Sequence, residues 1–153
     1  MTATRTTIDS FTGEYDFLSN FSPAAVAYDG IFWITVEHAY QAAKTVIPGE
    51  RLRIHNGLTP GQAKKAGRKV TLRPDWEKIK VGVMSDLLAC KFAVGSRLAD
   101  QLLATGNAVL IEGNTWGDRF WGKVNGKGEN WLGLLLMERR NFLSQQAGND
   151  HID

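Results

Sequence analysis

The sequence predicts an α+β fold that is mostly helical, formed as a single compact domain with a small antiparallel β-hairpin. A chain of 153 residues with 43% hydrophobic content is long enough to bury one substantial core. Several segments repeat apolar residues at helical spacing between glycines and prolines. One segment, "AAVAYDGIFWITV", instead places Asp29 and Gly30 between two runs of β-forming residues, which is typical of a tight hairpin turn.

The helices are predicted from their start and stop signals. Thr35 is the expected N-cap of the first helix, which ends at Pro48 and Gly49. In "TPGQAKKAGR", Thr59 begins a capping box and Gly67 stops the helix. The other expected elements are a long helix after Asp75, a helix from Ser96 to Gly106, a short strand in "AVLIE" and a final helix over 131–143.

Composition sets the class of protein. The net charge is +2, and the charges are mixed along the chain, which argues against bulk electrostatic binding to duplex DNA. One cysteine excludes an internal disulfide, and three histidines leave no Cys/His metal constellation. No leader or membrane span is apparent, so we expect a cytoplasmic protein with no membrane partner. The domain is expected over 11–144, with an N-terminal tail at 1–10 and a flexible C-terminal tail at 145–153.

The stretch "WITVEHAYQAAK" holds the first candidate site. In a helix, Glu37, Tyr40, Gln41 and Lys44 fall at i, i+3, i+4 and i+7, which is a single face. An acid, a phenol, an amide and an amine in line over alanines form either an ordinary solvated face or the wall of a site. The alignment of Lys44 with Glu37 favours a site, whereas His38 points away from that face and is expected to be structural.

A glycine-rich segment, 113–133, is the second candidate site. Trp116 and Trp121 flank Asp118 there, and large rigid faces beside a carboxylate suit stacking on a heterocycle while an acid acts nearby. Trp33 and Trp131 are expected in the core, and Trp76 is either a third stacking face or a structural contact between helices.

Two glycine-rich patterns in this segment resemble phosphate loops only in part. "GDRFWGKV" has Val124 where a Walker motif needs a hydroxyl, and "NGKGENWLG" lacks the spacing of a dinucleotide fingerprint. The second pattern places Gly126, Lys127, Gly128 and Asn130 at the start of the last helix. It is either a phosphate site or a flexible surface loop.

Seven motifs together resemble the NADAR family. They are "FLSNFSP", "EHAYQAAK", "GRKV", "KF", "LLATG", "GDRFWG" and "GKGENWLGLLLMERR", and they occur in the family's order from about Phe11 to Phe142. The resemblance implies a mostly helical N-glycosidase that hydrolyses the bond between ribose C1 and a nitrogen. The implied substrates are ADP-ribosylated guanine, as nucleoside or nucleic acid, or phosphorylated ribosylaminopyrimidine intermediates of riboflavin synthesis. One departure is "EGNTWGD", which is one residue longer than the family pattern and affects the placement of Trp116.

The resemblance assigns the family's functional acid to Glu37, its lysine to Lys44, its helix-opening tryptophan to Trp76 and its "DxxW" pair to Asp118 and Trp121. The expected catalytic residues are Glu37, Lys44 and Asp118. The expected substrate-binding residues are Asn20, Tyr40, Gln41, Trp76, Trp116, Trp121, Lys127 and Asn130. No metal or other cofactor is expected.

The chemistry of N-glycosidic cleavage agrees with this assignment. Positive charge develops on the sugar, the departing nitrogen needs a proton, and C1 needs a nucleophile. We expect Glu37 to stabilise charge and act as a base near the helix N-terminus, and Asp118 to donate the proton. The nucleophile is either the Lys44 amine, through an imine, or a water positioned by Glu37. The alternative function is a non-catalytic module that binds NAD or ADP-ribose.

Overall fold

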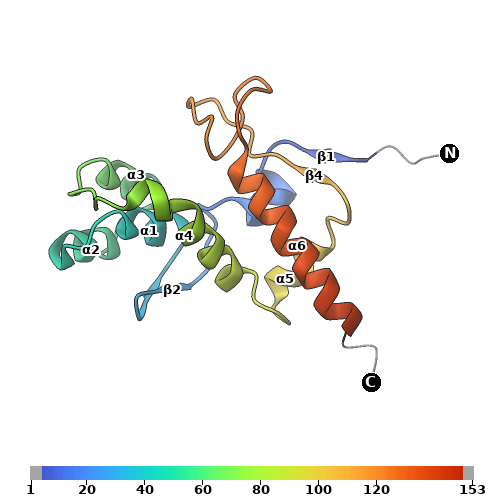
Figure 1. Cartoon of the computed structure of the whole chain (residues 1–153), viewed down its shortest axis with the longest axis horizontal. Coiled ribbons are helices and arrows are strands. Elements are labelled where there is room, and N and C mark those ends of the chain that lie inside the picture. The colour runs from blue at the N-terminus through green and yellow to red at the C-terminus, as the bar shows by residue number, and fades with distance from the viewer. Residues whose placement is uncertain (1–4, 150–153) are drawn as a thin grey trace. The chain divides into compact units, whose positions relative to one another are not determined.

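The computed structural model describes residues 5–149, which fold into two compact units. The central unit comprises Asn20–Lys91, and the terminal unit comprises the described residues 5–19 and 92–149. Both contain helices and short strands (Figure 1). The predicted α+β, mostly helical class is therefore confirmed.

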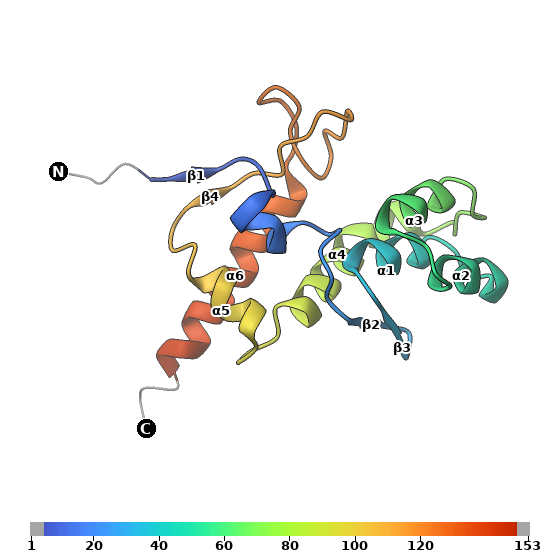
Figure 2. The same ribbon diagram turned by 180° about the vertical axis from the view of Figure 1, so that it is seen from behind.

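The central unit begins its regular structure with the predicted hairpin, formed by β2 (Val26–Tyr28) and β3 (Ile31–Trp33) (Figure 2). The strands pair antiparallel. Asp29 and Gly30 between them have φ of 50° and 76°, the left-handed values that a two-residue turn of this kind needs. This element is confirmed in type and position.

Four helices complete the central unit: α1 (Val36–Ala43), α2 (Pro48–His55), α3 (Pro60–Gly67) and α4 (Trp76–Lys91). The helix α1 contacts the other three helices and both strands, and all eight of its residues are buried. It is therefore the core helix of this unit, and it positions most of the first candidate site.

The N-caps of α1 and α3 confirm the predicted starts. Thr35 Oγ1 accepts a hydrogen bond from His38 N at 3.1 Å, and Thr59 and Gln62 form a complete capping box. The expected end of the first helix is wrong, because α1 stops at Ala43 and Pro48 begins α2. Proline is tolerated in a first helical turn because its missing N–H would have no helical acceptor there.

The terminal unit pairs β1 (Thr7–Ile8) in parallel with β4 (Val109–Leu110). The helix α6 (Trp131–Asn149) contacts β4 and α5 (Arg97–Leu103), and the 3-10 helix η1 (Gly13–Leu18) follows β1. Figure 1 shows β1 and β4 side by side next to α6. The strand predicted in "AVLIE" and the final helix are both confirmed.

The two expected tails contain ordered elements where the structure describes them. Within 1–10, Thr7 and Ile8 form β1, and Ile8 is buried. Within 145–153, α6 continues to Asn149. The parts of these tails at 1–4 and 150–153 lie outside the described residues.

Within residues 5–149, no helix is both long enough and apolar enough to cross a membrane. In the same described part of the chain, no three His, Cys, Asp or Glu side chains gather as a possible metal site.

Candidate active site

The N-terminus of α1 is fixed by Thr35 and His38. The His38 Nε2 atom lies 2.8 Å from the Leu58 carbonyl oxygen, so Nε2 carries the proton. Nδ1 then accepts from Thr35 Oγ1 at 2.7 Å. Both ring nitrogens are engaged, and His38 has the structural role that its position on the helix predicts.

The candidate acid Glu37 is buried one residue into α1. Its side chain accepts a hydrogen bond from Gln41 Nε2, with 2.7 Å between Nε2 and Oε1. Its main-chain N–H donates to the Asn20 carbonyl oxygen at 3.1 Å. Only 7% of Glu37 is exposed. The structure thus brings Asn20, Glu37 and Gln41 together, with the Gln41 amide bound to the acid.

Lys44 caps the C-terminus of α1 on the same face. Its Nζ lies 5.5 Å from the centre of the Tyr40 ring, and the Tyr40 and Trp76 ring centres are 5.1 Å apart. Trp76 is 4% exposed, and its ring packs against the Tyr40 ring. Three residues of the predicted face, Glu37, Tyr40 and Gln41, are therefore buried, and Lys44 at its end is half-buried.

Burial lowers the pKa of Lys44. The carboxylate of Glu37 acts in the opposite direction and raises it, while the positive charges of Arg68, Lys64 and Lys80 lower it further. A lower pKa leaves a larger fraction of the amine neutral at a given pH. The sequence pattern had identified Lys44 and Glu37 but not the basic side chains near them.

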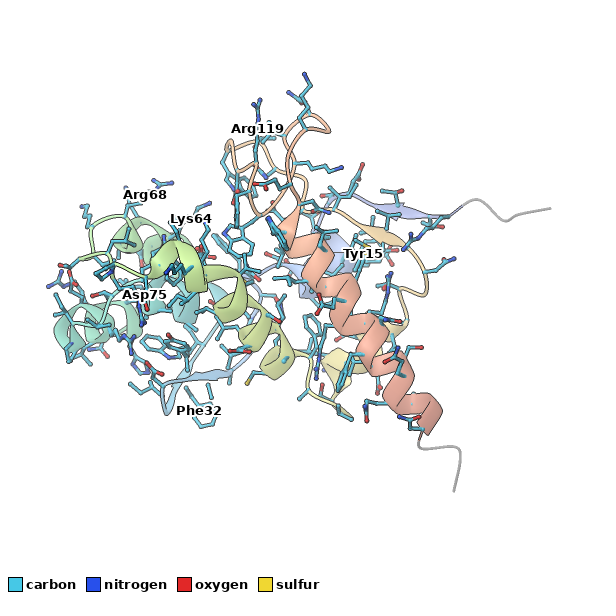
Figure 3. The ribbon with its side chains drawn as sticks, viewed as in Figure 1. Tyr15, Phe32, Lys64, Arg68, Asp75 and Arg119 are labelled. Carbon is cyan, nitrogen blue, oxygen red and sulfur yellow. The ribbon has the colours of Figure 1, made fainter. Side chains whose placement is uncertain are left out.

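These three basic side chains come from two helices packed on α1. Lys64 and Arg68 belong to the last turn and C-cap of α3, and Figure 3 shows them close together at that end of the helix. Lys80 on α4 pairs with Glu77 at 2.7 Å. Helical spacing within α3 was visible in the sequence, but the packing of α3 and α4 beside Lys44 was not.

The second candidate site, the segment 113–133 of the terminal unit, has its path fixed by main-chain hydrogen bonds. Lys123 N donates to the Glu112 carbonyl oxygen at 2.8 Å, and Leu132 N donates to the Trp121 carbonyl oxygen at 2.9 Å. Gly122 is required, because a Cβ there would lie 2.0 Å from the Glu112 carbonyl oxygen. The glycines in this loop serve close packing as well as tight turns.

Asp118 also binds the main chain of this loop. Its Oδ1 accepts from Phe120 N at 3.1 Å and from Trp121 N at 2.9 Å. Asn114, which the sequence analysis missed, donates from Nδ2 to the Asp118 carbonyl oxygen at 2.8 Å and accepts from Asp118 N at 3.0 Å. Asparagine in a turn often binds nearby main chain, so its place in "GNTWGD" was the available signal.

The loop tryptophans differ in exposure. Trp116 is 60% exposed. Trp121 is half-buried and meets Phe120 edge-on, with 4.8 Å between ring centres. Phe120 in turn stacks on Trp131 at 6.2 Å. Trp33 is buried as expected, whereas Trp131 is only half-buried.

Lys127 and Asn130 have different surroundings. Lys127 is exposed, next to a tight turn in which Val124 and Lys127 exchange main-chain hydrogen bonds of 2.8 and 3.0 Å. The Asn130 amide is buried and binds main chain at both ends, accepting from Glu112 N at 2.9 Å and donating to the Leu110 carbonyl oxygen at 3.0 Å. Asn130 thus ties the start of α6 to the strand β4.

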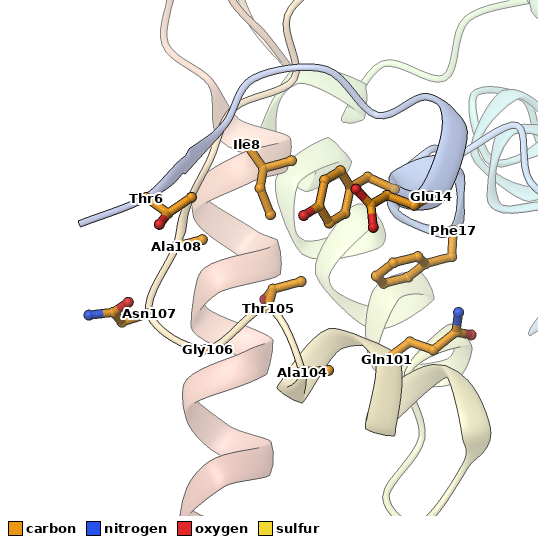
Figure 4. A pocket seen from close by; sticks show the side chains of 11 residues that line it. Thr6, Ile8, Glu14, Phe17, Gln101, Ala104, Thr105, Gly106, Asn107 and Ala108 are labelled. Carbon is orange, nitrogen blue, oxygen red and sulfur yellow. The ribbon is translucent and has the colours of Figure 1, made fainter. Parts of the chain in front are cut away.

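The terminal unit also contains a cavity of about 400 Å³ with none of the predicted site residues in its wall. In Figure 4, Glu14 and Phe17 of η1 lie across from Gln101 of α5 and the following Ala104. The wall mixes polar and apolar side chains without a cluster of one chemical kind.

Comparisons with known proteins agree with the motifs. The NADAR domain model matches residues 8–144, which include most of both units. "N-glycosidase YbiA" of Shigella flexneri serotype 5b is 40% identical over 138 residues, covering 88% of this chain and 86% of that protein. "Riboflavin biosynthesis protein PYRR, chloroplastic" of Zea mays is 36% identical over 157 residues, covering 89% of this chain and 25% of that protein. The NMR structure of E. coli YbiA matches with a TM-score of 0.82 and 37% identity over 97% of this chain and 92% of that one.

Proposed function

The chain belongs to the NADAR family of N-glycosidases, and we propose that this hydrolase cleaves the bond between C1 of a phosphate-bearing ribose and a base nitrogen. The substrates we propose are ADP-ribosylated guanine, as nucleoside or in nucleic acid, and phosphorylated ribosylaminopyrimidines of riboflavin synthesis. The observation that carries the proposal is the buried face of α1, where Glu37 and Lys44 lie on one side of the helix. A cytoplasmic setting, favoured by the single cysteine, is part of the proposal.

Glu37 supplies the negative charge that the reaction needs. As the bond from C1 to nitrogen lengthens, positive charge develops on the ribose, and a fixed carboxylate stabilises it without reorganisation. Glu37 suits this task because it is buried and held by the Gln41 amide. In water the same carboxylate would be solvated and free to turn away.

Lys44 is the proposed nucleophile. Because burial lowers its pKa, a larger fraction of its amine is neutral and has a lone pair to attack C1. The base then leaves with the bonding electrons and takes a proton from an acid. The ribose ring opens to an imine, which water hydrolyses to release the sugar and restore the amine. The alternative is direct attack by a water that Glu37 orients.

Phosphate recognition is supported by the basic side chains near Lys44. Lys64, Arg68 and Lys80 each act on the charge of Lys44 through space, so they lie near it. An anionic group on the substrate would offset the mutual repulsion of these side chains. Their positive charge would in turn raise the local concentration of an anionic substrate. Both proposed substrate classes carry such a group. The exposed Lys127 is a further candidate for a phosphate contact.

The loop residues have roles that rest on the family motif and on the chemistry of the loop itself. Asp118 is the proposed proton donor for the departing base, and Trp121 and the exposed Trp116 are proposed to stack on the base. At the α1 face, the proposed substrate-binding residues are Asn20, Tyr40 and Gln41. The Gln41 amide already donates a hydrogen bond to Glu37.

The test is a side-by-side assay of the two substrate classes. We would incubate the protein with ADP-ribosylated guanosine and with the phosphorylated ribosylaminouracil, and measure the free base by mass spectrometry. Release of the free base from either substrate by the parent, and its loss in Glu37→Gln, would support the proposal and identify the substrate. The name of the Zea mays relative favours the second substrate. If both stay intact while ADP-ribose binds in calorimetry, the protein is a binding module and the proposal is wrong.

A further inference from the structure

Gly67, the last residue of α3, lies directly against the side chain of Gln41 on α1. A Cβ at position 67 would lie 1.8 Å from Gln41 Oε1, 2.6 Å from its Cδ and 3.0 Å from its Cβ. These distances are below van der Waals contact, so no larger residue fits while Gln41 keeps its position. Gly67 does not have a left-handed φ. The side-chain contact, and not the backbone conformation, therefore requires glycine here.

Gln41 has little freedom to move away. It is only 3% exposed, and its Nε2 is bound to Glu37 Oε1 at 2.7 Å. Its Oε1 is buried and accepts no hydrogen bond from any described residue. A buried carbonyl without a donor is unfavourable, but turning the amide over would place Oε1 against the Glu37 carboxylate, where two acceptors repel. The amide is thus held between Glu37 on one side and Gly67 on the other.

We propose that Gly67 and Gln41 are positioning residues for Glu37. The missing side chain at position 67 leaves room for the Gln41 amide, and the N–H of that amide fixes the rotamer of the Glu37 carboxylate. A glutamate otherwise samples several rotamers, and a displacement of about 1 Å at a reacting group can cost on the order of 10²-fold in rate. This inference rests on the proposed function, in which Glu37 acts on the ribose.

The first experiment compares two alanine variants in the same helix. A Cβ at Gly61 would meet no atom within 4 Å, so Gly61→Ala is the matched control. Gly61→Ala should keep parent turnover and an equal or slightly higher melting temperature, because alanine favours helix. Gly67→Ala should displace the Gln41 amide and lower kcat by about 10- to 100-fold on the substrate that the parent cleaves. Parent turnover in Gly67→Ala would overturn the proposal.

The second experiment tests whether Gly67 acts through Gln41. Gln41→Ala removes Oε1 and Cδ, the two atoms that a Cβ at 67 would strike hardest, and leaves only the Cβ contact of 3.0 Å, so in that background Gly67→Ala should cost no further kcat and much less melting temperature than in the parent. Losses that simply add would show that the two residues act independently and overturn the proposal. The double variant also covers the case in which Gly67→Ala alone fails to fold.

The third measurement needs no substrate. A carboxylate that loses a hydrogen-bond donor is protonated more readily. The NMR titration of the Glu37 carboxyl carbon should therefore move to higher pH in Gly67→Ala and Gln41→Ala, and stay at the parent position in Gly61→Ala. An unmoved titration in all three variants would overturn the positioning role. If it moves but Glu37→Gln retains full turnover, the positioning holds and the proposed function of Glu37 fails.

Discussion

The face of α1 and the loop 113–133 hold their candidate functional side chains by opposite means. On α1 the side chains hold one another, since Gln41 binds Glu37 and Lys44 lies over the Tyr40 ring. In the loop the main chain holds them, since Asp118 accepts two N–H groups. A substitution on α1 should therefore alter the chemistry of its neighbours. In the loop, a substitution that preserves the main-chain hydrogen bonds should change only the chemistry of the substituted side chain.

The largest expected effect is a loss of turnover in Asp118→Asn, which tests whether main-chain hydrogen bonds hold the loop. In Asp118→Asn, the amide oxygen can still accept from Phe120 N and Trp121 N, so the loop and the substrate affinity should be preserved. Turnover should fall by about 10²- to 10⁴-fold if Asp118 is the general acid. Stopped assays give kcat, and calorimetry gives affinity. Unchanged turnover would remove Asp118 from the acid role and leave it with the structural one.

The second effect concerns Lys44. Arginine keeps the positive charge but not a nucleophilic amine, so Lys44→Arg should retain ligand binding and lose turnover by on the order of 10²-fold or more. Borohydride should reduce an imine and trap a covalent adduct on the parent protein alone, which mass spectrometry detects. An active arginine variant, with no adduct on either protein, would make water the nucleophile and Lys44 an electrostatic residue.

A smaller effect is expected for the loop aromatics. If Trp121 stacks on the base, Trp121→Ala should weaken substrate binding by about 1–3 kcal/mol. Calorimetry of binding and thermal melting check this together, and the exposed Trp116→Ala serves as a comparison variant. If Trp121→Ala instead unfolds the protein while the folded fraction binds normally, the contact with Phe120 is the main role of Trp121.

The smallest effect is a dependence of stability on pH. The pKa of Lys44 is lowered in the folded protein, chiefly by burial, so the unfolded chain binds more protons between the folded pKa and the ordinary value of about 10.4. The contribution of Lys44 to the stability of the parent should therefore rise with pH across that window. Lys44→Met has no such group, so its melting temperature relative to the parent should decline as the pH rises. A constant difference would argue against a depressed pKa.

Helix caps and tight turns could be predicted from the sequence, because they depend on residues that are close in the chain. Thr35 and Thr59 cap helices through bonds within a few positions, and Asp29 and Gly30 form their turn alone, so local pattern was sufficient. The position of Pro48 was misread because proline both ends and begins helices, and only the following residues distinguish the two cases.

Contacts between segments that are far apart in the chain could not be predicted from the sequence. Nothing near Gly67 reveals that Gln41 fills the space of its absent side chain, because α1 and α3 meet only in the folded unit. The same holds for Asn130, whose amide binds the main chain beside β4. Its position beside Lys127 at the start of the last helix suggested a contact with the substrate, and the main-chain bonds of its amide could not be read from that position.

The pairing of β1 with β4 has a consequence for the order in which the protein forms during translation. In the sequence, β1 precedes the central unit and β4 follows it. Thr7 and Ile8 therefore cannot pair with their partner strand until Val109 and Leu110 leave the ribosome. The central unit is one continuous segment, and its contacts are more local. We therefore expect nascent chains to gain protease resistance first across Asn20–Lys91, with the N-terminal strand protected only after β4 has emerged.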